Sequence, residues 1–94
     1  MNELEELHAE YRSALPAKVA RIDALWRERR MTELHRALHT LAGSAGSFGL
    51  REVSEAAREA ETYLDACGRA PDTGQQAGLQ QLLEAIYSRA ASAR

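Results

Sequence analysis

Helical spacing of apolar residues is the feature that most limits how this 94-residue chain can fold. Leucine and alanine recur three or four positions apart along most of its length, as in Leu34, Leu38 and Leu41. This period places apolar side chains on one face of an α-helix. β-branched residues are few, alternating apolar and polar runs are absent, and no Asn-Gly or Asp-Gly pair marks a hairpin turn. The pattern predicts an all-α protein.

Proline and polar positions divide the N-terminal half into predicted helices. A first short amphipathic helix is expected over about residues 2–14, with Leu4 and Leu7 on its apolar side. Pro16 fits the first turn of a second helix, where its missing N–H costs nothing. Thr32 is expected to be the N-cap of the third helix, because a threonine oxygen can accept from the free N–H groups there.

Two glycines and a capping residue mark the remaining boundaries. Gly49 is expected to end the third helix and to turn the chain into a fourth, which starts near Leu50. Gly68, followed three residues later by proline, is a strong signal for the end of that helix. Asp72 or Thr73 can cap the last helix. Four substantial helices with short connections predict an antiparallel up-down four-helix bundle, with the extra short N-terminal helix packed on one end.

The length and composition exclude several classes of protein. A chain of 94 residues with 45% hydrophobic content predicts a single folded domain over residues 1–94. A formal net charge of -2 without a basic block gives no support to nucleic-acid binding. No signal peptide is evident, and no apolar run approaches the ~18 residues of a membrane span. The single cysteine, Cys67, cannot form an internal disulfide, so the chain is expected to be cytoplasmic and not membrane-bound.

His39 lies between apolar neighbours in the third predicted helix, yet helical geometry directs it outward. At about 100° per residue, the leucines of this helix cluster in one apolar stripe that includes Leu34. His39 points about 140° away from Leu34. The histidine is therefore predicted to be exposed. Its neighbours on that face are small or polar, namely Thr32, His35, Arg36, Ala42, Gly43 and Gly46.

Gly43 and Gly46 follow His39 at intervals of about one turn on this face. A glycine inside a helix costs roughly 0.5–1 kcal/mol relative to alanine, so its presence needs a reason. Missing side chains would clear a flat approach for the backbone or a loop of another molecule. Alternatively, small residues here let neighbouring helices of the same bundle pack closely.

Three chemical interpretations of His39 follow. It can be an ordinary surface histidine. It can bind a metal together with His35, four residues earlier, as in helical zinc motifs. However, Arg36 replaces the glutamate of those motifs and no third ligand is evident, so no metal site is predicted. His39 can also be a nucleophilic imidazole that carries a phosphoryl group, which needs an exposed ring nitrogen, a partner that fixes the tautomer and room for docking.

The segment LHTLAGSAGSFGL, residues 38–50, resembles the signature of histidine-containing phosphotransfer (HPt) domains, His-x-Leu-Lys-Gly-Ser-Ala-x-x-x-Gly. It is also similar to the phosphorylated domain of chemotaxis histidine kinases. The stretches LPAKVARIDALW and VSEAAREAETYLDAC are similar to the flanking helices, so the resemblance extends over most of the chain. It implies a four-helix bundle that displays one phosphorylatable histidine, here His39. That residue would accept a phosphoryl group from the aspartate of one receiver domain and donate it to another.

The resemblance also implies partners and further site residues. Glu61 falls where family members often place Gln or Glu, from which it could hydrogen-bond the imidazole. The catalytic aspartate and Mg²⁺ would belong to the receiver, so this chain is expected to need no cofactor and not to be an enzyme. The expected partners are response-regulator receiver domains and a hybrid sensor histidine kinase of a two-component system, with the chain itself a monomer. The expected docking surface comprises Thr32, His35, Arg36, Ala42, Gly43 and Gly46, with part of the following helix.

The sequence departs from the family pattern at Ala42, where the usual lysine is thought to offset phosphoryl charge. A cation about 4 Å away is worth ~1 kcal/mol when exposed to water, so its loss should slow phosphorylation without preventing it. Arg36 is expected to substitute for it, and Arg58, one turn before Glu61, is a second candidate.

The departure at Ala42 keeps a second functional hypothesis open. The chain could be a non-catalytic interaction module that binds a receiver or kinase without accepting phosphate. The third hypothesis is a helical bundle that binds an unrelated partner.

Overall fold

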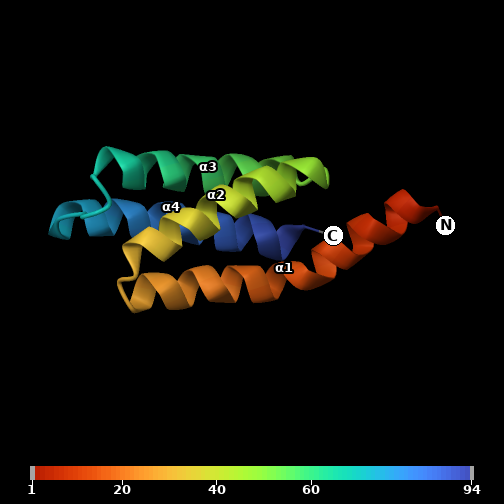
Figure 1. The fold of residues 1–94 in the computed structure, drawn as a ribbon, viewed down its shortest axis with the longest axis horizontal. Helices are drawn as coiled ribbons and strands as arrows, with labels where there is room; N and C mark the ends of the chain where they lie inside the picture. The colour runs from red at the N-terminus through yellow and green to blue at the C-terminus, as the bar shows by residue number, and fades with distance from the viewer. Residues whose placement is uncertain (1, 94) are drawn as a thin grey trace.

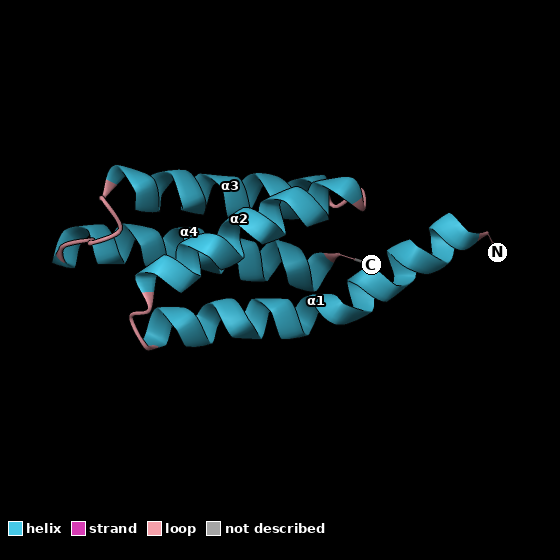
Figure 2. Ribbon diagram, viewed as in Figure 1, coloured by secondary structure: helices cyan, strands magenta, loops and turns pink. Residues whose placement is uncertain are grey.

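The computed structural model describes residues 2–93, and every regular element within that range is an α-helix (Figure 2). Helix α1 spans Glu3–Arg27, α2 spans Met31–Ser47, α3 spans Arg51–Ala66 and α4 spans Thr73–Ser92. The all-α prediction is confirmed. The described residues form four helices rather than the five expected.

The helices lie side by side along a long axis, and the molecule measures 48 × 20 × 20 Å. Consecutive helices run in opposite directions (Figure 1). Three-residue connections join α1 to α2 and α2 to α3, which favours antiparallel neighbours. Helix α2 packs on α3, α3 packs on α4, and α1 contacts both α2 and α4. These contacts close a ring around a common core.

Helix α1 is continuous through Pro16, so the prediction of a separate short N-terminal helix is wrong. A proline inside a helix removes one hydrogen bond and bends the axis, but strong helix formers on both sides allow the helix to continue. Tyr11 and Leu15, which both precede Pro16, are buried and hold this part of α1 against the bundle. The N-terminal part of α1 veers away and extends beyond the end of the bundle (Figure 1). Leu4 and Leu7 are consequently exposed rather than packed.

The helix boundaries follow most of the predicted signals. Gly49 and Gly68 adopt φ values of +78° and +62°, the left-handed conformation that suits glycine after a helix. Asp72 caps α4 in a reciprocal capping box. The prediction for Thr32 is wrong, because it lies inside the first turn of α2. The N-cap of that helix is Arg30, which makes no side-chain capping bond.

The core lies between the four helices and is built from unequal faces of α2 and α3. Leucine dominates the buried face of α2, whereas alanine dominates that of α3. Small residues on one partner allow two helices to approach closely. This approach brings the outer edge of α2, including His39, beside the outer edge of α3. The buried residues of the two helices are Leu34, Leu38, Leu41, Ala42 and Ala45 on α2, and Val53, Ser54, Ala56, Ala57, Ala60 and Leu64 on α3.

Candidate functional site

His39 lies near the middle of α2, and its side chain is 75% exposed. The predicted outward orientation is confirmed. The buried leucines on the opposite side of α2 fix the rotation of the helix about its axis, so the histidine is held outward by the core and not by a loop. A mid-helix residue of this kind is presented on a rigid backbone.

Glu61 of α3 is the partner of this imidazole. Its Oε2 lies 2.7 Å from Nδ1 of His39, which is hydrogen-bond distance. The Glu61 side chain is only 16% exposed, so water competes poorly for its carboxylate. A carboxylate can only accept, so Nδ1 carries the proton in this contact. The opposite nitrogen, Nε2, is then the ring atom with a free lone pair.

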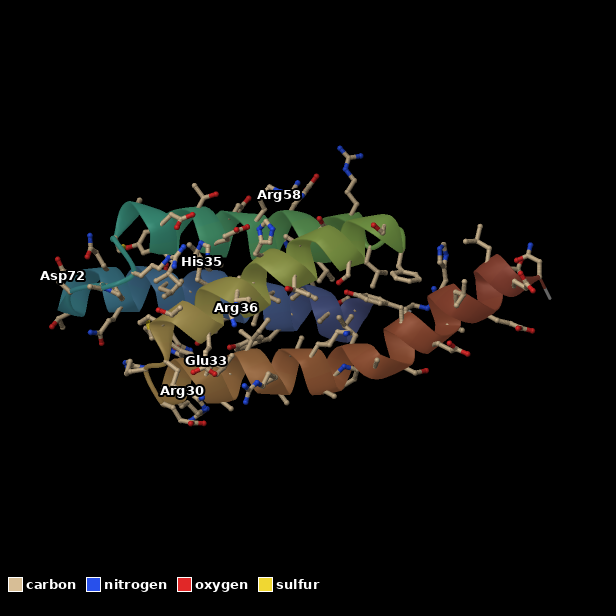
Figure 3. All side chains as sticks on the ribbon, viewed as in Figure 1. Arg30, Glu33, His35, Arg36, Arg58 and Asp72 are labelled. Carbon is tan, nitrogen blue, oxygen red and sulfur yellow. The ribbon has the colours of Figure 1, made fainter. Side chains whose placement is uncertain are left out.

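His35 is turned toward α3 and does not lie on an open docking surface, contrary to the expectation. Its side chain is 15% exposed, and Nε2 lies 2.9 Å from Oδ1 of Asp65 and 3.9 Å from Oε2 of Glu61. Figure 3 shows His35 on the side of α2 that faces α3. The close His35 imidazole lowers the pKa of the Asp65 carboxyl. Asp65 was missed by sequence reasoning, although its spacing from Glu61 equals that of His35 from His39.

Ala42 is 3% exposed, so its expected place on the exposed face is wrong. Its backbone carbonyl accepts a hydrogen bond from Ser54 Oγ of α3 at 2.6 Å. The prediction assumed that α2 buries only the face centred on its leucine stripe. In the structure α2 packs against both α1 and α3, so a wider part of its surface is buried. The site therefore has a small buried residue at the position of the family's lysine.

The two glycines of α2 differ in their surroundings. A Cβ at Gly43 would meet nothing within 4 Å, so this position is open surface, as expected. A Cβ at Gly46 would lie 3.2 Å from Ser54 Oγ. Gly46 is exposed, but it also permits the close packing of α2 on α3. This is the alternative role predicted from the sequence for the small residues of this face. Only Gly43 clears space that is not already used by the bundle.

The comparison with family models found a match to the Hpt domain over residues 6–91. The chain belongs to the Hpt domain family. Comparisons with curated proteins and with solved structures gave no match. Hpt domains are phosphocarrier modules that act in phosphorelay signalling together with receiver domains and histidine kinases.

Two exposed cations of this Hpt domain, Arg36 and Arg58, lie on either side of the His39–Glu61 pair. Arg36 lines a groove between α1 and α2, on the side of α2 away from α3 (Figure 3). Arg58 lies on the outer side of α3 and lines a shallow hollow shared with α4 (Figure 3). Thr32 is exposed in the first turn of α2, two turns before His39. None of the described helices of this Hpt domain has the length and apolar character required to cross a membrane.

Proposed function

We propose that His39 is the residue of this Hpt domain that carries the phosphoryl group. The observation that carries the proposal is the contact between Nδ1 of the exposed imidazole and the shielded carboxylate of Glu61. This contact holds the proton on Nδ1 and directs the lone pair of Nε2 toward solvent, where a receiver domain can reach it.

In the proposed reaction, Nε2 attacks the phosphorus of an aspartyl phosphate on a receiver domain. The N–P bond forms as the bond to the aspartate oxygen breaks, and the aspartate leaves as a carboxylate. The positive charge that develops on the imidazole is stabilised by Glu61 through the Nδ1 proton. The reverse reaction passes the group to a second receiver. The catalytic aspartate and Mg²⁺ belong to the receiver, so this chain acts as a carrier without a cofactor of its own for the transfer.

Charge stabilisation from this chain is expected to be modest. Ala42 supplies no cation, and an exposed cation at this distance would contribute only ~1 kcal/mol. Arg36 is the proposed substitute because it is exposed and lies beside His39 on α2. Arg58, on the outer side of α3, is the weaker candidate. Most of the rate enhancement is therefore assigned to positioning by the receiver and by Glu61.

The proposed docking surface is the exposed part of α2 around His39, with Thr32, Arg36 and Gly43, and the adjoining edge of α3. The proposed partners are receiver domains and a hybrid sensor histidine kinase in the cytoplasm, with this chain acting as a monomer. The alternative function is an interaction module that binds these partners without being phosphorylated. Ala42 in place of the usual lysine is the observation that favours the alternative.

Phosphorylation by a phosphorylated receiver domain tests the proposal. The wild-type chain should acquire an acid-labile label, and His39→Gln should acquire none because it lacks the nucleophilic nitrogen. His8→Gln is the matched control and should retain the label, since His8 lies on α1 beside Phe48 and away from His39.

A label that persists in His39→Gln would refute the assignment of His39. Binding of a receiver by the wild-type chain without any label would support the interaction module instead. Loss of both binding and label would point to an unrelated partner.

A further inference from the structure

Two histidines of α2 and two carboxylates of α3 meet across the helix pair. His35 and His39 are four residues apart, as are Glu61 and Asp65, and this spacing places each pair on one face of its helix. The contacts between the pairs are His39 to Glu61 at 2.7 Å, His35 to Asp65 at 2.9 Å and His35 to Glu61 at 3.9 Å. Phosphoryl transfer at His39 uses only the first of these contacts.

His35 is the member of this group that lacks a hydrogen-bonding explanation. Its Nε2 atom is buried and lies 2.9 Å from Oδ1 of Asp65, but it makes no hydrogen bond of acceptable geometry with any described residue. A buried polar atom without a partner costs free energy, so its retention requires another explanation. Imidazole nitrogens and carboxylate oxygens are both ligands that Zn²⁺ takes in proteins.

The ligand atoms of His35, Glu61 and Asp65 have the spacing that one cation requires. All three lie within 4.8 Å of one another. Zinc–nitrogen and zinc–oxygen bonds are about 2.0–2.2 Å long, so one ion can contact all three after small side-chain adjustments. No metal site was predicted from the sequence, because no third ligand was evident near His35 and His39. The structure supplies the missing ligands from α3, and a motif confined to one helix cannot reveal them.

We propose that His35, Glu61 and Asp65 form a binding site for a divalent transition-metal ion of the Zn²⁺ type. One imidazole nitrogen and two carboxylate oxygens suit Zn²⁺, and water can take the fourth position of a tetrahedral site. The two carboxylates neutralise the charge of the ion. Mg²⁺ is expected to bind poorly, because it prefers oxygen ligands in octahedral geometry.

Metal binding at this site competes with the contact that orients His39. The same oxygen, Oε2 of Glu61, faces both His35 Nε2 and His39 Nδ1. A cation bound to that oxygen withdraws electron density from its hydrogen bond to His39. This coupling, which rests on the proposed function, makes the site an inhibitory one for phosphorylation.

Titration of the untagged chain with Zn²⁺, followed by calorimetry, tests the binding without any receiver domain. We expect one Zn²⁺ per chain, and a tetrahedral absorption spectrum when Co²⁺ replaces it. His35→Ala and Asp65→Asn should each weaken Zn²⁺ binding by at least about tenfold, since each removes a ligand. Asp65 is half exposed, so Asp65→Asn leaves the core intact.

Matched controls locate the ion. Glu59→Gln removes another exposed carboxylate of α3, and His8→Ala removes the third histidine of the chain. Both controls should bind Zn²⁺ as the wild type does. The proposal is overturned if the wild-type chain does not bind Zn²⁺, if His35→Ala or Asp65→Asn binds it with unchanged affinity, or if a control loses binding to the same extent.

The coupling has its own measurement. The rate of His39 phosphorylation is measured with and without Zn²⁺, at one fixed concentration that saturates the wild type but not Asp65→Asn. Zn²⁺ should slow the wild type several-fold and should leave the rate of Asp65→Asn unaffected. Equal slowing of the wild type and Asp65→Asn would overturn the proposed coupling between metal binding and phosphorylation. If no label forms under any condition, the proposed phosphotransfer fails, while the calorimetric result on metal binding stands independently.

Discussion

Gly43 illustrates at the scale of one residue how stability is exchanged for access. It lies inside α2, and its φ is not in the left-handed region, so the backbone there does not require glycine. An alanine methyl group at this position would contact nothing in the bundle. Glycine therefore lowers the stability of the helix relative to alanine, and packing within the bundle does not compensate for this loss. In the proposed function, the open space is occupied by a docked receiver.

Gly43→Ala should raise the free energy of unfolding by roughly 0.5–1 kcal/mol, the difference in helix propensity. The same change should slow phosphotransfer several-fold, because the methyl group lies on the docking surface one turn from His39. Urea denaturation and the rate of transfer from a phosphorylated receiver measure the two effects. Gly46→Ala is the control, and it should bring a smaller gain in stability because its Cβ would crowd Ser54 Oγ. Unchanged transfer by a stabilised Gly43→Ala would contradict the docking surface.

At the scale of the helix, α1 divides into a packed and an unpacked part. From Tyr11 onward it contributes large side chains to the core, whereas its first two turns extend beyond the bundle (Figure 1). Leu7 and Leu15 have the same side chain in the same helix, but Leu7 is half exposed and Leu15 is 1% exposed. They therefore form a natural pair for measuring what packing contributes.

Leu15→Ala should lower the free energy of unfolding by about 2–5 kcal/mol, because it leaves a cavity in the core. Leu7→Ala should change it by no more than about 0.5 kcal/mol, because the side chain is already in contact with water. Denaturant unfolding followed by circular dichroism measures both. A loss of similar size for the two variants would show that the start of α1 packs against the bundle in solution.

The difference between local and tertiary information explains which elements were predictable. The buried face of α2 follows from spacing alone, since the period of a helix determines which residues share a side. The continuity of α1 through Pro16 does not, because it depends on the packing of Tyr11 and Leu15, just before the proline, into the core. Thr32 likewise has the right chemistry for a cap, but the helix begins before it.

The candidate site shows the same division. The exposure of His39 could be derived from one helix, and the position of Glu61 from the family resemblance. The contact of His35 with Asp65 and the burial of Ala42 depend on how α2 and α3 are rotated against each other. No pattern within a single helix contains that rotation.

At the scale of the molecule, Tyr87 links α4 to α1. Its hydroxyl donates to Oδ1 of Asp23 at 3.4 Å. Burial raises the pKa of the Tyr87 phenol well above its usual range, and the neighbouring Asp23 carboxylate raises it further. Because the pKa is higher in the folded state than in the unfolded state, the folded state holds this proton more tightly. The associated stability is present below about pH 10 and is lost as the pH rises above it.

The wild-type chain should therefore lose more free energy of unfolding than Tyr87→Phe between about pH 9 and about pH 11. The variant has no phenol to ionise, so its stability should depend less on pH in this interval. Urea denaturation at a series of pH values provides the comparison. Parallel profiles for the two proteins would show that Tyr87 ionises as readily in the folded chain as in the unfolded one.

The residues around His39 come from α2 and α3, two helices joined by a turn of three residues. Helix α4 and most of α1 support this hairpin from behind without entering the site. Substitutions on those supporting helices can therefore change how long the protein survives heat or proteolysis while leaving its choice of partner intact. In the proposed function, α2 and α3 serve both stability and recognition, whereas α4 and most of α1 serve stability alone, so durability can be engineered there without altering the choice of partner.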